Sequence, residues 1–150
     1  MKENISEHIS YDEATHTSVV GVPNIPTAEY LESMKYVANG IFEKVRAHFG
    51  KPIAINSFFR SSAVNAKIAG ASKTSQHSYG EAIDMSGTPY GVSNKDIFNY
   101  IKDNLTFDQL IWENGTNENP VWVHCSLKRG INRRSILRKR ANSNGYEKFV

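Results

Sequence analysis

The sequence predicts a single α+β domain with a central antiparallel sheet flanked by helices. The chain has 150 residues, which suits one hydrophobic core of ordinary size. Apolar residues recur at helical spacing through one long segment, and several short apolar segments are separated by loops rich in Gly, Ser and Asn. No internal repeat interrupts this order, so we expect one site.

The first predicted element is a long helix between Thr27 and Phe49. Thr27 can act as its N-cap, and Gly50 can provide the left-handed residue that ends it. The apolar residues are spaced to form one buried face: Leu31, Met34, Val37, Ala38, Ile41, Phe42, Val45 and Phe49.

A strand and a short helix are predicted next. Residues 53–59 are rich in isoleucine and phenylalanine, which is typical of a strand. Ser61 or Ser62 can then cap a short helix that ends near Gly70. Arg60 lies at the junction between the two elements.

The second half of the chain alternates loops with short elements. Residues 71–80 are rich in Ser, Thr and Gly and predict a loop, which is followed by a strand at residues 82–85. Another amphipathic helix begins after Ser93. Residues 108–113 and 121–126 predict two strands, and the polar loop between them favours antiparallel pairing.

Two absences limit the class of protein. The chain has no stretch of about 18 uncharged apolar residues, and residues 1–11 are polar, so we expect neither a membrane span nor a signal peptide. The one cysteine, Cys125, cannot form an internal disulfide. Because it alternates with His124 along a predicted strand, we expect it to be buried on the core face.

The charge is unevenly distributed. Residues 128–150 carry eight basic side chains and one acidic one, although the net charge of the chain is only +3. We interpret 1–127 as the folded domain and 128–150 as a basic tail. This tail is either solvated and partly disordered, bound to anionic wall polymers, or docked through Ile131, Ile136 and Leu137. Nucleic acid is the least favoured partner, because no helix-turn-helix or aromatic stacking platform accompanies the charge.

His77, Asp84 and His124 are the residue types of a catalytic zinc site. Two imidazoles and one carboxylate fill three positions of a tetrahedral ion and leave the fourth for water. His77 lies in the predicted loop and Asp84 on the strand after Gly80, so the chain can fold back and direct both at one point. His124 shares a strand face with Trp122.

Several linked motifs then point to a family. They are Ser57-Phe-Phe-Arg60-Ser, Ser75-x-His77-x-x-Gly80-x-Ala82-x-Asp84 and Trp122-Val-His124. In this order they resemble the M15 family of zinc D-Ala-D-Ala carboxypeptidases and peptidoglycan endopeptidases. The resemblance covers about residues 5–127. It is strongest to the small phage-associated branch, which shares the Asp-Gln-Leu-Ile-x-Glu strand present at 108–113.

The resemblance implies a hedgehog/D-Ala-D-Ala-peptidase-like fold and assigns roles position by position. By this resemblance we expect Zn²⁺ to be bound by His77, Asp84 and His124. The resemblance also implies that Arg60 polarises the scissile carbonyl and that Ser75 contacts the substrate near its carboxylate.

The general base departs from the family pattern. Many members have an acidic residue or a histidine two or three positions before the last ligand, where this chain has Val121 and Trp122. Glu113 on the preceding strand is our candidate, provided that the hairpin register places it on the same face as His124. Glu118 is the alternative base. Trp122 either lines the substrate cleft or belongs to the core.

These features predict zinc-dependent hydrolysis of a peptide bond in the peptidoglycan stem peptide. The resemblance also implies a monomeric phage enzyme of lysis or host penetration. Such an enzyme is made in the host cytoplasm and acts on the cell wall, either released by a holin or carried in the virion. The competing interpretation is a non-catalytic wall-binding module that keeps the fold and the zinc, which the missing acid before His124 favours.

Overall fold

A computed structural model describes residues 2–68, 71, 74–143 and 145–149 of the chain. The predicted long helix is present as three consecutive segments: α2 (Ala28–Val37), the π-helical η1 (Ala38–Phe42) and α3 (Glu43–Phe49). The Thr27 side chain accepts a hydrogen bond from the Tyr30 backbone N–H, and Gly50 ends the helix with a φ of 64°. Both caps are therefore those that the sequence predicts.

The shorter helices include the two that the sequence predicts, after Ser61 and after Ser93, together with others that it does not predict. They are α1 (Tyr11–Ala14), α4 (Ser62–Ala66), the 3-10 helices η2 (Gln76–Tyr79) and η3 (Thr88–Tyr90), and α5 (Asn94–Asn104). Ser61 caps α4 by accepting from the Val64 backbone N–H at 3.2 Å. The helix ends at Ala66, earlier than expected, and Gly70 lies outside the described residues. In the described part of the chain, no helix has the length and apolar character needed to cross a membrane.

Six strands form one sheet in the order β1-β2-β4-β3-β5-β6. The strands are β1 (Ala54–Ser57), β2 (Ala82–Ser86), β3 (Gln109–Glu113), β4 (Trp122–Ser126), β5 (Ser135–Lys139) and β6 (Glu147–Lys148). The predicted antiparallel pairing of β3 with β4 is confirmed. Neighbouring strands are antiparallel throughout, except that β5 runs parallel to β3. The predicted α+β class with a central antiparallel sheet is thus confirmed.

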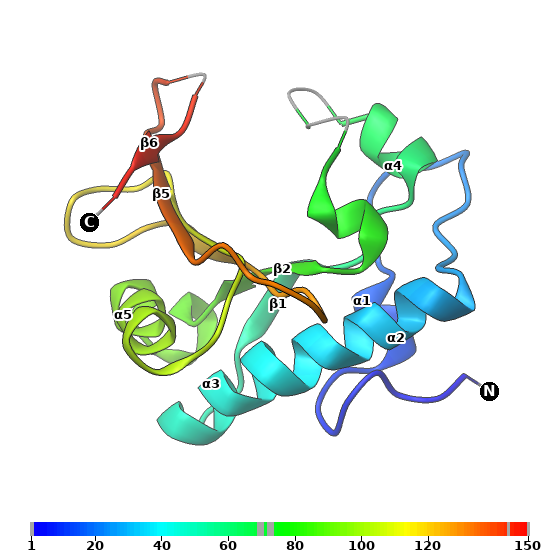
Figure 1. Cartoon of the computed structure of the whole chain (residues 1–150), viewed down its shortest axis with the longest axis horizontal. Helices are drawn as coiled ribbons and strands as arrows, with labels where there is room; N and C mark the ends of the chain where they lie inside the picture. The colour runs from blue at the N-terminus through cyan, green and yellow to red at the C-terminus, as the bar shows by residue number, and fades with distance from the viewer. Residues whose placement is uncertain (1, 69–70, 72–73, 144, 150) are drawn as a thin grey trace.

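The long helix and α5 cover one face of the sheet (Figure 1). Figure 1 shows α2, α3 and α5 below the sheet, whereas α4 and β6 rise above it on opposite sides. Alternate strand residues point to the helices and are buried in the core: Ile83, Met85, Leu110, Trp112, Val123 and Cys125. Burial of Cys125 on this face is as predicted. Because the helices take up the apolar side of the sheet, the other side is free to carry polar groups.

The C-terminal segment is docked on the domain. β5 pairs with β3, and Ile136 packs against the core, whereas Ile131 is exposed. The expectation of a solvated, partly disordered end is therefore wrong for residues 135–139, and docking through Ile136 is what the structure shows. The sequence did not predict this strand, because its pairing partner lies far away in the chain and its basic residues indicated solvent exposure. The division into 1–127 and 128–150 stays a prediction about folding units.

Candidate active site

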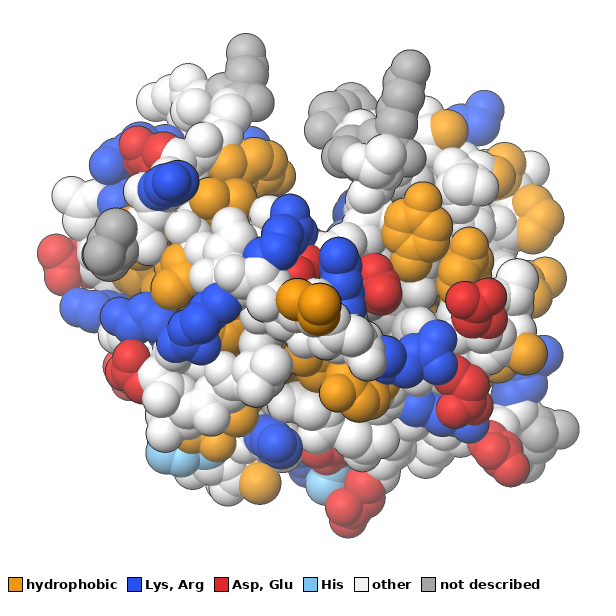
Figure 2. Space-filling model, viewed as in Figure 1, with side chains coloured by type: hydrophobic (Ala, Val, Ile, Leu, Met, Phe, Trp, Pro, Cys, Tyr) orange, Lys and Arg blue, Asp and Glu red, His pale blue; other side chains and the backbone are white. Residues whose placement is uncertain are grey.

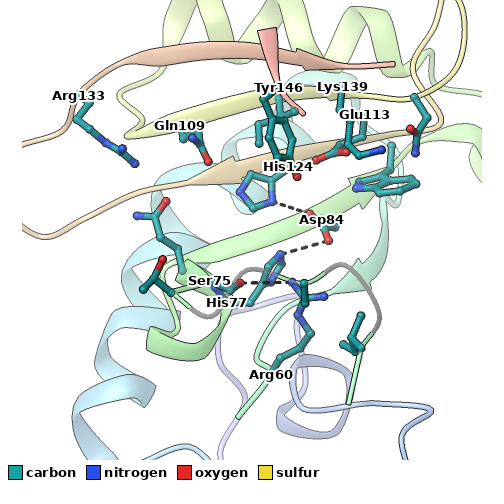
Figure 3. A pocket seen from close by; sticks show the side chains of 17 residues that line it. Arg60, Ser75, His77, Asp84, Gln109, Glu113, His124, Arg133, Lys139 and Tyr146 are labelled. Carbon is teal, nitrogen blue, oxygen red and sulfur yellow. Dashed lines mark hydrogen bonds and ion pairs between the residues drawn. The ribbon is translucent and has the colours of Figure 1, made fainter. Parts of the chain in front are cut away.

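Three predicted side chains converge on the sheet face opposite the helices (Figure 3). Asp84 on β2 and His124 on β4 are cross-strand partners, and His77 reaches them from η2. His124 Nδ1 lies 2.9 Å from Asp84 Oδ1, and His77 Nε2 lies 3.3 Å from Asp84 Oδ2. One ligand atom from each residue lies within 4.8 Å of the other two.

Local structure fixes the orientation of His77. Ser75 caps η2 by accepting from the His77 backbone N–H at 3.2 Å, and Gly80 ends the turn with a φ of 71°. The buried imidazole donates from Nδ1 to the Phe58 carbonyl oxygen at 2.7 Å. Because a carbonyl can only accept, this bond leaves Nε2 of the neutral ring unprotonated and directed at Asp84. A backbone acceptor of this kind is the usual support for a metal-binding histidine.

The donor set fits a zinc ion. Burial raises the pKa of Asp84, but His77 and His124 outweigh it and hold that pKa well below its usual range. The site therefore offers one carboxylate and two imidazoles. Ligand atoms about 2.0–2.1 Å from a tetrahedral zinc lie about 3.3–3.4 Å from one another. The 3.3 Å separation between His77 Nε2 and Asp84 Oδ2 matches this spacing, and His124 Nδ1 lies 2.9 Å from the other carboxylate oxygen, Oδ1.

Glu113 lies on the same sheet face as this cluster. It ends β3 directly opposite Trp122, and strand alternation places it on the face that carries His124. The register thus meets the condition on which its candidacy as a base depends. Burial raises the pKa of Glu113, and Asp84 adds to this rise, while His124 and Lys139 oppose it. Glu118, the alternative base, is exposed on the β3–β4 loop and does not line the cleft.

Arg60 approaches the cluster from the end of β1. Its Nη2 donates to Ser75 Oγ at 3.5 Å, and its backbone N–H donates to the His77 carbonyl oxygen at 3.2 Å. Burial lowers the pKa of Arg60, which Asp84 partly offsets, and a guanidinium remains charged at neutral pH. The buried Nε of Arg60 has no hydrogen-bond partner among the described residues, and the same holds for Nε1 of Trp122.

Except for Glu118, all the predicted site residues line one cleft of about 570 Å³. Figure 2 shows this side of the molecule hollowed between two lobes, with charged side chains of both signs at the base of the hollow. Trp122 lines the cleft rather than belonging only to the core. The lining residues that the sequence did not predict include Gln109, Arg133, Lys139 and Tyr146. The last three come from the segment interpreted as a tail, and only the pairing of β5 with β3 reveals their position.

Comparison with known proteins agrees with this site. A sequence model of the family described as Peptidase M15 matches residues 7–126, which is most of the chain. No curated protein matches. The matched segment contains the three converging side chains as well as Arg60 and Glu113. The chain therefore belongs to the Peptidase M15 family, whose members are metal-dependent peptidases.

Proposed function

We propose that this protein is a zinc-dependent peptidase that hydrolyses an amide bond in the stem peptide of peptidoglycan. One observation carries the proposal: the buried carboxylate of Glu113 shares a cleft with the cluster of His77, Asp84 and His124. A metal-ligand set alone is compatible with a structural ion. An additional carboxylate beside it is what a hydrolase needs in order to move a proton.

The residues of the cleft divide the chemistry between them. His77, Asp84 and His124 would hold the zinc, which when bound supplies a Lewis acid that makes water nucleophilic near neutral pH. Glu113 accepts the proton of the attacking water and later delivers it to the leaving amine. Its raised pKa favours both transfers, because it lies nearer to the pH at which the group must first accept a proton and then return it. Arg60 donates to the carbonyl oxygen as negative charge develops there.

The cleft suits a short anionic peptide. A volume of about 570 Å³ is within the range of small-ligand sites and admits a few residues of extended chain. The cations Arg60, Arg133 and Lys139 line it and complement the carboxylates of a stem peptide. Ser75 and Trp122 line the same cleft, which supports a role for both in contacting the substrate. A role in phage lysis or host penetration is supported by the motif resemblance alone.

The experiment is digestion of purified cell wall, followed by release of D-alanine and of new amino groups with and without zinc. We expect zinc-dependent release by the wild-type protein. Glu113→Gln should keep one equivalent of zinc but lose about 100-fold or more in rate, the usual contribution of a general base. His124→Ala should lose both the zinc and the activity. Glu118→Gln is the matched control and should retain near-normal activity.

Two results would change the proposal. A wild-type protein that binds zinc and wall but releases neither product would be a non-catalytic wall-binding module. Near-normal activity of Glu113→Gln would move the base elsewhere. Mass spectrometry of the digested wall identifies the bond and so separates a carboxypeptidase from an endopeptidase.

A further inference from the structure

Strand pairing holds the C-terminal segment against the site. β5 is parallel to β3, and Lys139 is the partner of Glu113. β6 is antiparallel to β5, and its register, continued by one residue, sets Tyr146 opposite Lys139. Trp122 lies opposite Glu113 on the other side. Trp122, Glu113, Lys139 and Tyr146 thus form one row across the cleft face of the sheet, and all four line the cleft.

The side chain of Tyr146 is directed at the cluster. Figure 3 shows its ring beside His124, with Arg60 on the opposite side of the converging residues. Its hydroxyl makes no hydrogen bond with any described residue. The side chain remains about half exposed, with 55% of its surface accessible, so a ligand entering the cleft can reach it.

The chemistry of this position suits a hydrogen-bond donor. Burial raises the pKa of Tyr146, and Glu113 and Asp84 raise it further, which outweighs the opposing effect of Arg60. The phenol therefore stays protonated at neutral pH and can donate. Since no described residue accepts from this hydroxyl, an oxygen atom of a substrate in the cleft can accept from it.

We propose that Tyr146 contacts the substrate and donates a hydrogen bond to the reacting carbonyl oxygen, from the wall of the cleft opposite Arg60. The inference rests on the proposed function and adds to it a donor from outside the family-matched residues 7–126. A donor directed at developing charge binds the transition state more tightly than the ground state. Its loss therefore lowers kcat more than it raises KM.

The test is Tyr146→Phe, which removes the hydroxyl and keeps the ring. Kinetics are measured on the soluble stem peptide that the wild-type protein cleaves. We expect kcat to fall about 10- to 100-fold, with KM within about twofold and zinc content unchanged. The inhibition constant of a phosphinate peptide analogue of the cleaved bond should rise by the same factor as kcat/KM falls. Tyr90→Phe is the control, because Tyr90 is also partly exposed but does not line the cleft.

The outcomes separate this inference from the function on which it rests. Failure of the wild-type protein to cleave the peptide with zinc bound removes the proposed function. If the wild-type protein is active, unchanged kcat in Tyr146→Phe overturns the inference alone. A rise in KM without a fall in kcat, or a fall in kcat accompanied by loss of zinc or of thermal stability, overturns it as well. The first would indicate ground-state binding, and the second a structural role.

Discussion

Three buried carboxylates show how neighbouring side chains decide the behaviour of an acidic residue. Burial raises the pKa of each of them, but the neighbours differ. The two imidazoles beside Asp84 and the guanidinium beside Asp108 reverse the effect of burial, whereas around Glu113 burial prevails. The first arrangement suits a metal ligand, the second a structural ion pair and the third a base.

Asp108 anchors the C-terminal segment to β3, and we predict that Asp108→Asn destabilises the fold. Its carboxylate accepts from Arg133 Nη2 at 2.7 Å, from the Arg133 backbone N–H at 2.8 Å and from Gln76 Nε2 at 3.1 Å. Hydrogen bonds to a buried charged group contribute about 2 kcal/mol. Urea denaturation at neutral pH should therefore show a free energy of unfolding lower by about that amount.

The effect of Asp108→Asn on the free energy of unfolding should also depend on pH. The folded-state pKa of Asp108 is lowered from 3.8, because Arg133 and Gln76 outweigh burial. Its stabilising contribution is then present above the unfolded-state pKa and is lost as the pH falls through the folded-state pKa. The difference in unfolding free energy between wild type and Asp108→Asn should shrink below about pH 4. A difference that persists into acid would contradict this assignment, and Asp103→Asn, at an exposed position, is the control.

At the scale of elements, the sequence predicts the helices and strands that are marked by residues within or next to them. Thr27 and Gly50 mark the ends of the long helix through their own side chains and backbone preferences, and Ser61 does so for the start of α4. The candidate ligand positions are likewise recognisable, because His77 and Asp84 lie a few residues apart on a turn and a strand. Sequence could not predict β5, because parallel pairing with β3 is a non-local contact with no short connecting turn.

Gly80 links the local turn to the site, and we predict that Gly80→Ala costs more than Gly50→Ala. Both glycines have positive φ, 71° and 64°, so a side chain is strained at either position by about 1 kcal/mol. Only at Gly80 would the new Cβ also collide, lying 2.6 Å from the Tyr30 carbonyl oxygen and 2.8 Å from Met34 Cγ. Relief of that collision must move the turn that carries His77.

Urea denaturation and competitive zinc titration of the two variants check this prediction. Gly50→Ala should lose about 1 kcal/mol and keep the zinc affinity of the wild type, since nothing lies within 4 Å of its new Cβ. Gly80→Ala should lose more stability and bind zinc more weakly. Equal losses of stability with equal zinc affinity would show that the packing of this turn against α2 does not position His77.

At the scale of the whole molecule, the cleft lies over the middle of the sheet, and its walls come from the two sides. β2 and β4 provide the floor with Asp84 and His124. One wall contains Arg60 and residues of η2, and the other contains Lys139 of β5 and Tyr146 (Figure 3). The family-matched residues 7–126 contain the floor and the first wall only. The second wall depends on residues 128–150, whose basic charge predicted a tail.

Truncation tests whether residues 128–150 are separable from the domain of residues 1–127. We predict that a chain ending at residue 127 does not fold cooperatively. Removing residues 128–150 leaves β3 as an edge strand paired only with β4, and it takes away the Arg133 partner of Asp108 and the core contact of Ile136. A chain ending at residue 143 keeps β5 and Arg133, so it should fold and bind zinc while turning over more slowly without Tyr146. Circular dichroism on heating, sedimentation and zinc titration distinguish the two. A cooperatively folded, zinc-binding chain of residues 1–127 would instead mean that the peptidase domain is autonomous and that β5 is an accessory to it.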